Sequence, residues 1–198
     1  MTTTFFLVRH AAHDNVGSYL AGRMGGVSLG PAGQAQAMHL ARRMSREPLA
    51  AICSSPRERT LETAKPMAIA CAVKTIAIRA ELDEIDFGAW SGKTFEELNK
   101  DAAWQTWNSQ RQSACTPSGE TMQDVQERVI GLMDAVRQNA MNQCVALISH
   151  ADVIKAAVCK VLGLQLGDCF RFDIEPASIT TIVCGDWGSK LIRLNESA

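Results

Sequence analysis

Arginine and histidine side chains follow short apolar segments at three places in this sequence. The segments and the residues that follow them are Phe5–Val8 with Arg9 and His10, Cys53–Ser55 with Arg59, and Ala146–Ser149 with His150. In open α/β sheets the ligand site lies outside the carboxyl ends of the strands. We therefore expect two guanidinium groups and two imidazoles to converge in one pocket, and this combination suits a phosphate group.

His10 is the candidate nucleophile among these residues. A neutral imidazole can attack phosphorus and hold the phosphoryl group as a phosphoramidate. Nearby arginines disfavour the imidazolium and so lower the pKa of His10, and they also bind the three equatorial oxygens of a transferring phosphoryl group. A lone histidine is more often structural, so it is the neighbouring Arg9, Arg59 and His150 that favour catalysis.

The elements that must position these residues alternate between apolar runs and helical periodicity. We expect strands over residues 5–9, 49–54, 73–78, 144–149, 178–183 and 191–194. We expect helices over residues 31–46, 56–70, 94–104, 121–136 and 153–162. This order predicts an α/β fold, a single three-layer α/β/α domain over residues 1–198, with a mostly parallel sheet and helices on both faces.

An irregular excursion at about residues 86–120 interrupts this alternation. A connection of this length inside a compact domain is usually functional, and we expect it to cover the site. It contains Trp104 and Trp107, which a helix would place three residues apart on one face. Packing in the core is the commoner role for such a pair, and a platform for an apolar leaving group is the alternative. After the excursion, Thr121 and Asp124 resemble a helix capping box.

Composition excludes several classes of protein. The net charge of −1 gives no overall field that would attract nucleic acid or a membrane surface. No segment approaches the ~20 apolar residues of a membrane span, and the N-terminus lacks the basic region of a signal peptide. The seven cysteines show no CxxC spacing and favour reduced, mostly buried thiols. We expect a cytoplasmic protein.

Four sequence blocks, in order, resemble the histidine phosphatase superfamily, which includes the cofactor-dependent phosphoglycerate mutases. The blocks are Leu7-Val8-Arg9-His10, the segment from Ser54 to Ala64, the segment from Leu82 to Gly92, and Ser149-His150. The segment from Pro117 to Thr121 matches a further feature of the family. The resemblance covers nearly the whole chain and implies a phosphoglycerate mutase-like fold.

The resemblance also implies a role for each site residue. His10 would be the phosphorylated nucleophile, and Glu84 the acid that protonates the leaving alkoxide. The phosphate ligands would be Arg9, Arg59 and His150. To donate a proton near neutral pH, Glu84 would need a pKa raised by burial beside Phe87 or Trp90.

Two of these assignments have competitors in the sequence. Arg57 lies two residues before Arg59, and we expect it to be a solvated surface charge. Glu84 is surrounded by Glu81, Asp83 and Asp86. In the first turn of the helix after His150, Asp152 would oppose a phosphate, so we expect it to face away from the pocket.

The sequence departs from the family pattern just after His10. Ala11 stands where the family usually has glycine, Ala12 where glutamate is common, and Val16 where a phosphate-binding asparagine is usual. Residues that could compensate are His13, Asp14, Asn15 and Arg23. We therefore retain Asn15, Arg23 and Trp104 as further candidate site residues.

These features predict a metal-independent phosphomonoester hydrolase that needs no cofactor and acts on a small phosphorylated metabolite. We expect no nucleic-acid or membrane partner and leave a homodimer open. The first alternative is a cofactor-dependent phosphoglycerate mutase. Mutases of the family generally carry longer insertions and a C-terminal tail, whereas this chain ends a few residues after its last expected strand. The second alternative is a phospho-ligand binding module with weak or no catalysis, which Ala11, Ala12 and Val16 keep open.

Overall fold

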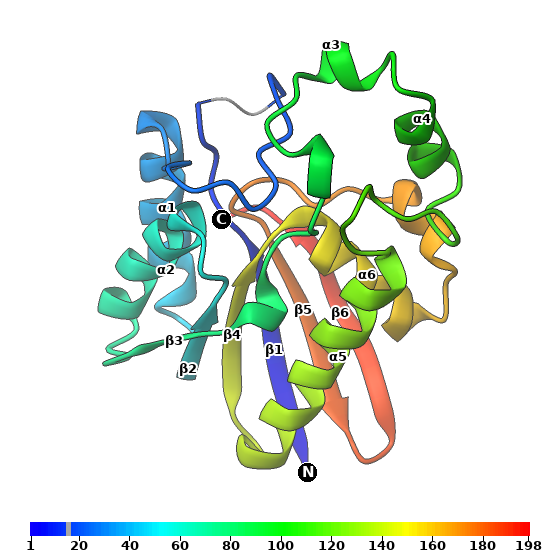
Figure 1. Ribbon diagram of the computed structural model, residues 1–198. Helices are drawn as coiled ribbons and strands as arrows, with labels where there is room; N and C mark the ends of the chain where they lie inside the picture. Colours follow the sequence, from blue (N-terminus) through cyan, green and yellow to red (C-terminus); the bar gives the residue numbers. More distant parts are fainter. Residues whose placement is uncertain (15–16) are drawn as a thin grey trace.

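The computed structural model describes residues 1–14 and 17–198, and within these residues six strands form one mixed sheet (Figure 1). The strands are β1 (Thr2–Arg9), β2 (Leu49–Ser54), β3 (Ile76–Ile78), β4 (Cys144–Ser149), β5 (Ile179–Gly185) and β6 (Gly188–Glu196). Their order across the sheet is β3-β2-β4-β1-β5-β6. The four strands from β3 to β1 are parallel, while β5 runs antiparallel to both β1 and β6. The predicted, mostly parallel α/β sheet is confirmed.

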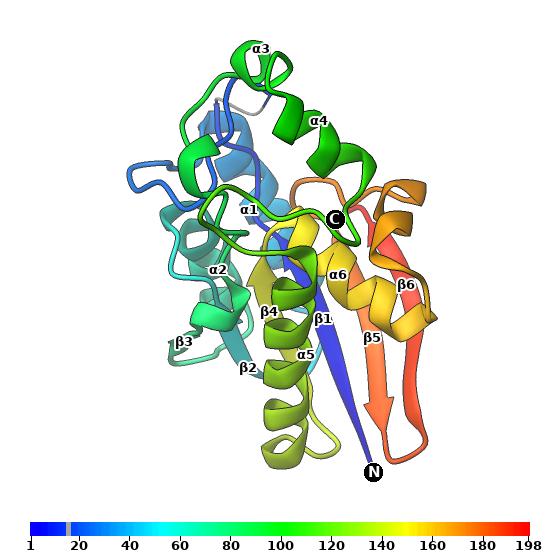
Figure 2. The ribbon, with the colours of Figure 1, turned by 45° about the vertical axis from the view of Figure 1, so that its right-hand side comes forward.

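Helices cover both faces of this sheet, as predicted. One face carries α1 (Pro31–Met44) and α2 (Glu58–Ala70), and the other carries α5 (Met122–Asn139) and α6 (Ala151–Leu162) (Figure 2). Side chains alternate across a strand. In β1, Phe6 and Val8 therefore pack with α1 and α2, while Phe5 and Leu7 pack with α5 and α6.

The excursion between β3 and α5 crosses the end of the sheet at which β1 and β4 finish (Figure 1). It contains the short helices η1 (Ala80–Leu82), η2 (Gly88–Trp90), α3 (Phe95–Leu98) and α4 (Ala102–Ser109). The single helix expected at 94–104 is two helices, because the Asp101 carboxylate accepts a hydrogen bond from the Ala103 N–H and starts a new helix.

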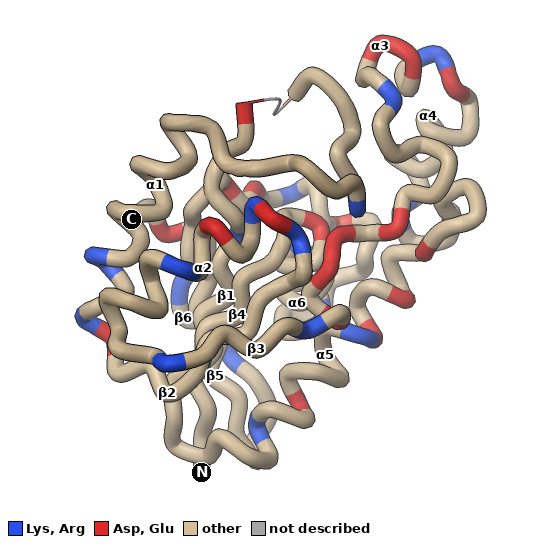
Figure 3. Tube along the Cα trace, turned by 60° about the vertical axis from the view of Figure 1, so that its left-hand side comes forward, with Lys and Arg blue, Asp and Glu red and all other residues tan. Residues whose placement is uncertain are grey.

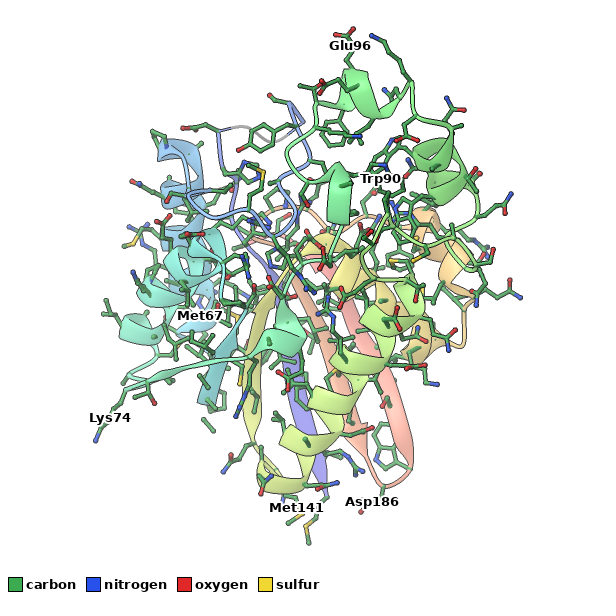
Figure 4. The ribbon with its side chains drawn as sticks, in the orientation of Figure 1. Met67, Lys74, Trp90, Glu96, Met141 and Asp186 are labelled. Atoms are coloured by element: carbon green, nitrogen blue, oxygen red, sulfur yellow. The ribbon has the colours of Figure 1, made fainter. Side chains whose placement is uncertain are left out.

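Aromatic side chains form the core beneath this excursion. The rings of Trp90 and Trp104 meet edge to face with centroids 5.3 Å apart, and Trp107 is fully buried. Figure 4 places Trp90 at the α3 end of the molecule, whereas Met141 and Asp186 lie at the opposite end. Of the two roles considered for Trp104, the structure supports packing in the core.

Several boundaries follow from local hydrogen bonds. The third strand starts at Ile76 rather than Val73, because the Val73 N–H caps α2 at the Ala68 carbonyl. The capping box of Thr121 and Asp124 at the start of α5 is confirmed. The remaining short helix, η3, spans Leu166–Arg171 and follows α6. All seven cysteines are free thiols. Among the described residues, no helix has both the length and the apolarity needed to cross a membrane.

Candidate active site

The carboxyl ends of β2, β4 and β1 lie side by side and bring the predicted site residues together. Backbone hydrogen bonds extend beyond the strands, since the N–H groups of His10 and Ser55 donate to β4 carbonyls at 3.0 Å. A pocket of about 170 Å³ opens at this edge. Its lining includes Arg9, His10, Arg59 and Glu84, together with His13, Gly17, Tyr19, Leu20, Ala21, Gly22 and Phe95.

Hydrogen bonds fix which nitrogen of His10 is available for attack. The Nε of Arg59 donates to Nε2 of His10 at 3.3 Å, so Nε2 carries the lone pair. The other nitrogen, Nδ1, therefore carries the hydrogen and donates it to the Ala11 carbonyl at 2.8 Å. Burial, and then the charge of Arg59, lower the pKa of His10 well below its ordinary value. Nε2 is thus the basic, potentially nucleophilic atom of a neutral ring.

The two arginines retain hydrogen-bond donors for an anion. Arg59 is 1% exposed and donates from Nη2 to the Gly22 carbonyl at 2.8 Å. Arg9 donates from Nη1 to the Ile174 carbonyl at 2.6 Å. Among the described residues, the buried Nη1 of Arg59 and Nε of Arg9 have no hydrogen-bond partner. Buried donors are normally satisfied, so these two atoms fit an anionic ligand.

His150 is the N-cap residue of α6 and, unlike the other predicted phosphate ligands, does not line the pocket. Its ring is fully buried and meets the ring of His10 edge to face, with centroids 5.1 Å apart. Nδ1 of His150 lies 3.2 Å from Nη2 of Arg59 and 3.6 Å from Oε2 of Glu84. Arg59 therefore contacts both imidazoles.

Glu84 is the carboxylate that reaches the pocket. Its Oε1 accepts a hydrogen bond from the Ile85 N–H at 2.9 Å. Burial, and then the nearby charge of Asp152, raise the pKa of Glu84 to about 7. A carboxyl group with this pKa can donate and accept a proton near neutral pH. Its sequence neighbours Glu81, Asp83 and Asp86 are not among the pocket-lining residues.

Two other candidate residues lie away from the pocket, and one is outside the described residues. Arg23 is not part of the lining, because its Nε donates to the Glu84 carbonyl at 2.8 Å and its Nη2 to Glu120 at 2.9 Å. Trp104 belongs to the aromatic core beneath the excursion. Asn15 falls outside the described residues.

The expectation for Arg57 was wrong. Instead of a solvated surface charge, Arg57 is 23% exposed and holds both carboxylate oxygens of Asp83, with N–O distances of 2.8 and 2.7 Å. This bidentate pairing satisfies a buried carboxylate next to Glu84, which is why the side chain turns inward. Asp152 is absent from the lining, as expected, and pairs with Arg111 at 3.3 Å.

Some lining residues had little or no signal in the sequence. His13, considered as a replacement for the missing asparagine, lies with its ring centroid 6.0 Å from that of His10. Tyr19 and Phe95 were not predicted, because an isolated antiparallel bridge between Tyr19 and Thr94 joins two loops far apart in the sequence. Only the tertiary structure reveals such a contact.

Comparisons with known proteins agree with this geometry. Residues 5–197 match the histidine phosphatase superfamily (branch 1). Phosphoserine phosphatase 1 of Hydrogenobacter thermophilus is 33% identical over 193 residues, which cover 96% of this chain and 90% of the relative.

Solved structures show the same architecture. A phosphoserine phosphatase from Entamoeba histolytica, in complex with 3-phosphoglyceric acid, is 27% identical, with a TM-score of 0.86 and coverage of 98% of this chain and 97% of that one. A mycobacterial glucosyl-3-phosphoglycerate phosphatase shares the fold over 100% of both chains, with a TM-score of 0.89 at 24% identity. The chain belongs to the histidine phosphatase superfamily, branch 1, and is a phosphatase.

Proposed function

We propose that this phosphatase hydrolyses phosphomonoesters of small metabolites without a metal ion, through a phosphohistidine at His10. The observation that carries the proposal is the tautomer of His10, which leaves Nε2 as the lone-pair nitrogen beside Arg59. Arg9, Arg59 and Glu84 line the same pocket and supply the charges that the reaction needs.

In the first step, Nε2 of His10 attacks phosphorus and the bond from phosphorus to the ester oxygen breaks. The protonated carboxyl group of Glu84 gives its proton to the leaving alkoxide, which departs as an alcohol. The phosphorylated ring carries a positive charge, which the Ala11 carbonyl stabilises through the bond from Nδ1–H. Arg9 and Arg59 offset the negative charge on the phosphoryl oxygens.

In the second step, the carboxylate of Glu84 takes a proton from a water molecule, and the water oxygen attacks phosphorus. The bond from phosphorus to Nε2 breaks and inorganic phosphate leaves. His10 is again neutral and Glu84 again protonated, so the cycle closes.

Phosphoserine is the first substrate to test, because the curated relative described above is a phosphoserine phosphatase. The solved relatives are named for phosphoserine and glucosyl-3-phosphoglycerate. We therefore propose small phosphomonoesters that also carry a carboxylate as the substrate class.

The direct test is hydrolysis of p-nitrophenyl phosphate and phosphoserine in the presence of EDTA, with His10→Ala as the control. The proposal predicts turnover by the unmodified protein and none by the variant. No turnover by the unmodified protein at any pH from acid to neutral would refute it and favour a binding module. Interconversion of phosphoglycerates stimulated by diphosphoglycerate would instead establish a mutase.

A further inference from the structure

A hydrogen-bonded chain links His150, Ser55 and Asp83, and none of the three lines the pocket. Nε2 of His150 lies 2.9 Å from Oγ of Ser55, and that hydroxyl donates to Oδ1 of Asp83 at 3.2 Å. Ser55 and His150 are fully buried, and Asp83 is 5% exposed.

The chemistry of Asp83 fixes the direction of this chain. Its carboxylate accepts two hydrogen bonds from the Arg57 guanidinium, and Oδ1 also accepts from the Glu84 N–H at 2.9 Å. An ionised carboxylate only accepts, so the hydrogen between Ser55 and Asp83 comes from the serine. A serine hydroxyl has one hydrogen. The Ser55 oxygen can therefore only accept from His150, which places the hydrogen on Nε2 of that ring.

This arrangement determines which nitrogen of His150 faces the catalytic groups. With Nε2–H bonded to Ser55, Nδ1 points toward Nη2 of Arg59 at 3.2 Å and Oε2 of Glu84 at 3.6 Å. If the ring turned over about its Cβ–Cγ bond, Nδ1 would no longer face Arg59 and Glu84. The Arg59 guanidinium can only donate, so its contact with Nδ1 requires the same tautomer as the bond from Nε2–H to Ser55.

We propose that Ser55 is a positioning residue which, with Asp83, holds the ring of His150 so that its Nδ1 accepts from Nη2 of Arg59 and orients that guanidinium for the phosphate. The ring does this as a neutral imidazole, because burial, and then the charge of Arg59, lower the pKa of His150 well below its ordinary value. The carboxylate of Asp83 takes the hydrogen bond of the Ser55 hydroxyl and so leaves the serine oxygen to accept from Nε2–H. The part of this inference that concerns the phosphate rests on the proposed function, whereas the tautomer does not.

Ser54 provides a matched control within the same strand end. Its side chain is also fully buried, but its hydroxyl donates to the Ser55 backbone carbonyl at 2.9 Å. Ser54→Ala and Ser55→Ala thus remove the same group from neighbouring buried positions, and only the second touches His150. Ser55→Thr keeps the hydroxyl.

The first experiment is NMR of the ring nitrogens in protein labelled with ¹⁵N-histidine, with signals assigned by replacing each histidine in turn. For His150 in the unmodified protein we expect hydrogen on Nε2 and a lone pair on Nδ1. Ser54→Ala and Ser55→Thr should keep this pattern, whereas in Ser55→Ala the Nε2 hydrogen, which has lost its acceptor, should exchange faster with solvent and change its chemical shift. Hydrogen on Nδ1 in the unmodified protein would overturn the proposal without any variant having to fold. Equal exchange rates and chemical shifts of the Nε2 hydrogen in Ser55→Ala and Ser54→Ala would also overturn it.

The second readout is kinetic. A phosphate ligand that acts in both the ground state and the transition state affects KM more than kcat. Ser55→Ala should therefore raise KM about tenfold, the scale of one lost hydrogen bond, with a smaller change in kcat. An unchanged KM would contradict the positioning role. The predicted tautomer in a protein that turns over no phosphomonoester would refute the proposed function and leave the tautomer assignment standing.

Discussion

The two imidazoles of the site present opposite nitrogens to the same guanidinium. His10 uses Nδ1 to bond the Ala11 carbonyl and turns Nε2 toward Arg59. His150 uses Nε2 to bond Ser55 and turns Nδ1 toward Arg59. In each ring, the nitrogen that points away from Arg59 donates a hydrogen bond to its own acceptor. This bond leaves the lone pair on the nitrogen that faces Arg59. Reactivity at the residue scale is thus set by groups outside the pocket.

The pKa of Glu84 predicts how kcat depends on pH. Glu84 must be protonated to assist the first step, and its pKa is raised to about 7. A bound phosphate dianion raises this pKa further, so kcat should fall as pH rises through a value at or above about 7. For a substrate with a poor leaving group, such as phosphoserine, Glu84→Gln should lower kcat by about 10²–10⁴-fold and remove this dependence. If kcat of Glu84→Gln decreased with rising pH in the same way, another group would be responsible for the pH dependence.

The same carboxyl group should make stability depend on pH. The folded protein retains this proton at pH values where the unfolded chain has lost it, because the pKa rises from 4.5 to about 7 on folding. The contribution of Glu84 to stability is therefore greatest below the unfolded pKa and declines until pH exceeds the folded one. Relative to the unmodified protein, Glu84→Gln should gain roughly 3 kcal/mol in free energy of unfolding between about pH 5 and pH 8. Urea denaturation at both pH values measures this, and a constant difference would contradict it.

The sequence was sufficient to predict that Arg9, His10, Arg59, Glu84 and His150 would converge. Four of them follow apolar strands whose ends must meet at one edge of a parallel sheet, and the family resemblance selected Glu84. The partner of Arg57 was not predictable, because Asp83 lies 26 residues away and no local pattern links the two. Likewise, the role of Ser55 depends on a contact with His150 across 95 residues.

At the scale of elements, short apolar strands inside the sheet were the most predictable. Leu49–Ser54 and Cys144–Ser149 have the expected bounds, because both are short apolar runs in the middle of the sheet. The excursion was less predictable. Its two helices α3 and α4 begin at the caps Thr94 and Asp101, and its core forms only when Trp90, Trp104 and Trp107 come together.

Trp104 should therefore contribute to stability rather than to substrate binding. It is 7% exposed and contacts the rings of Phe87, Trp90 and Phe95. Trp104→Ala should lower the free energy of unfolding by about 3–5 kcal/mol, the usual cost of such a truncation in a core. Trp104→Phe should cost less and leave KM unchanged. A raised KM with an unchanged Tm in Trp104→Phe would place the indole in the substrate site instead.

At the scale of the whole molecule, attraction for an anion is local rather than global. The net charge is −1, and Figure 3 shows acidic and basic residues interspersed along the chain. Positive charge without a carboxylate partner is found in the pocket, where buried nitrogens of Arg9 and Arg59 have no hydrogen-bond partner among the described residues.

Inorganic phosphate should consequently raise Tm more than chloride does at equal ionic strength. A ligand that binds only the folded state at 100 times its Kd stabilises it by about 2.7 kcal/mol. Arg59→Gln should remove most of this difference, while Arg46→Gln, which follows the C-terminal end of α1 and is outside the pocket lining, should retain it. Equal Tm values in phosphate and chloride for the unmodified protein would contradict a phosphate site here.

The most direct test of the mechanism is to trap the phosphorylated enzyme. Glu84→Gln lacks the base for the second step, while p-nitrophenolate leaves as the anion without protonation, so the first step should outpace the second. Mixing this variant with p-nitrophenyl phosphate should add one phosphoryl group, stable to base and labile to acid, and peptide mass spectrometry should locate it on His10. The double variant that combines Glu84→Gln with His10→Ala should acquire no phosphoryl group. A phosphoryl group on any other residue, or turnover by the unmodified protein with no phosphoryl group trapped in Glu84→Gln, would contradict the mechanism.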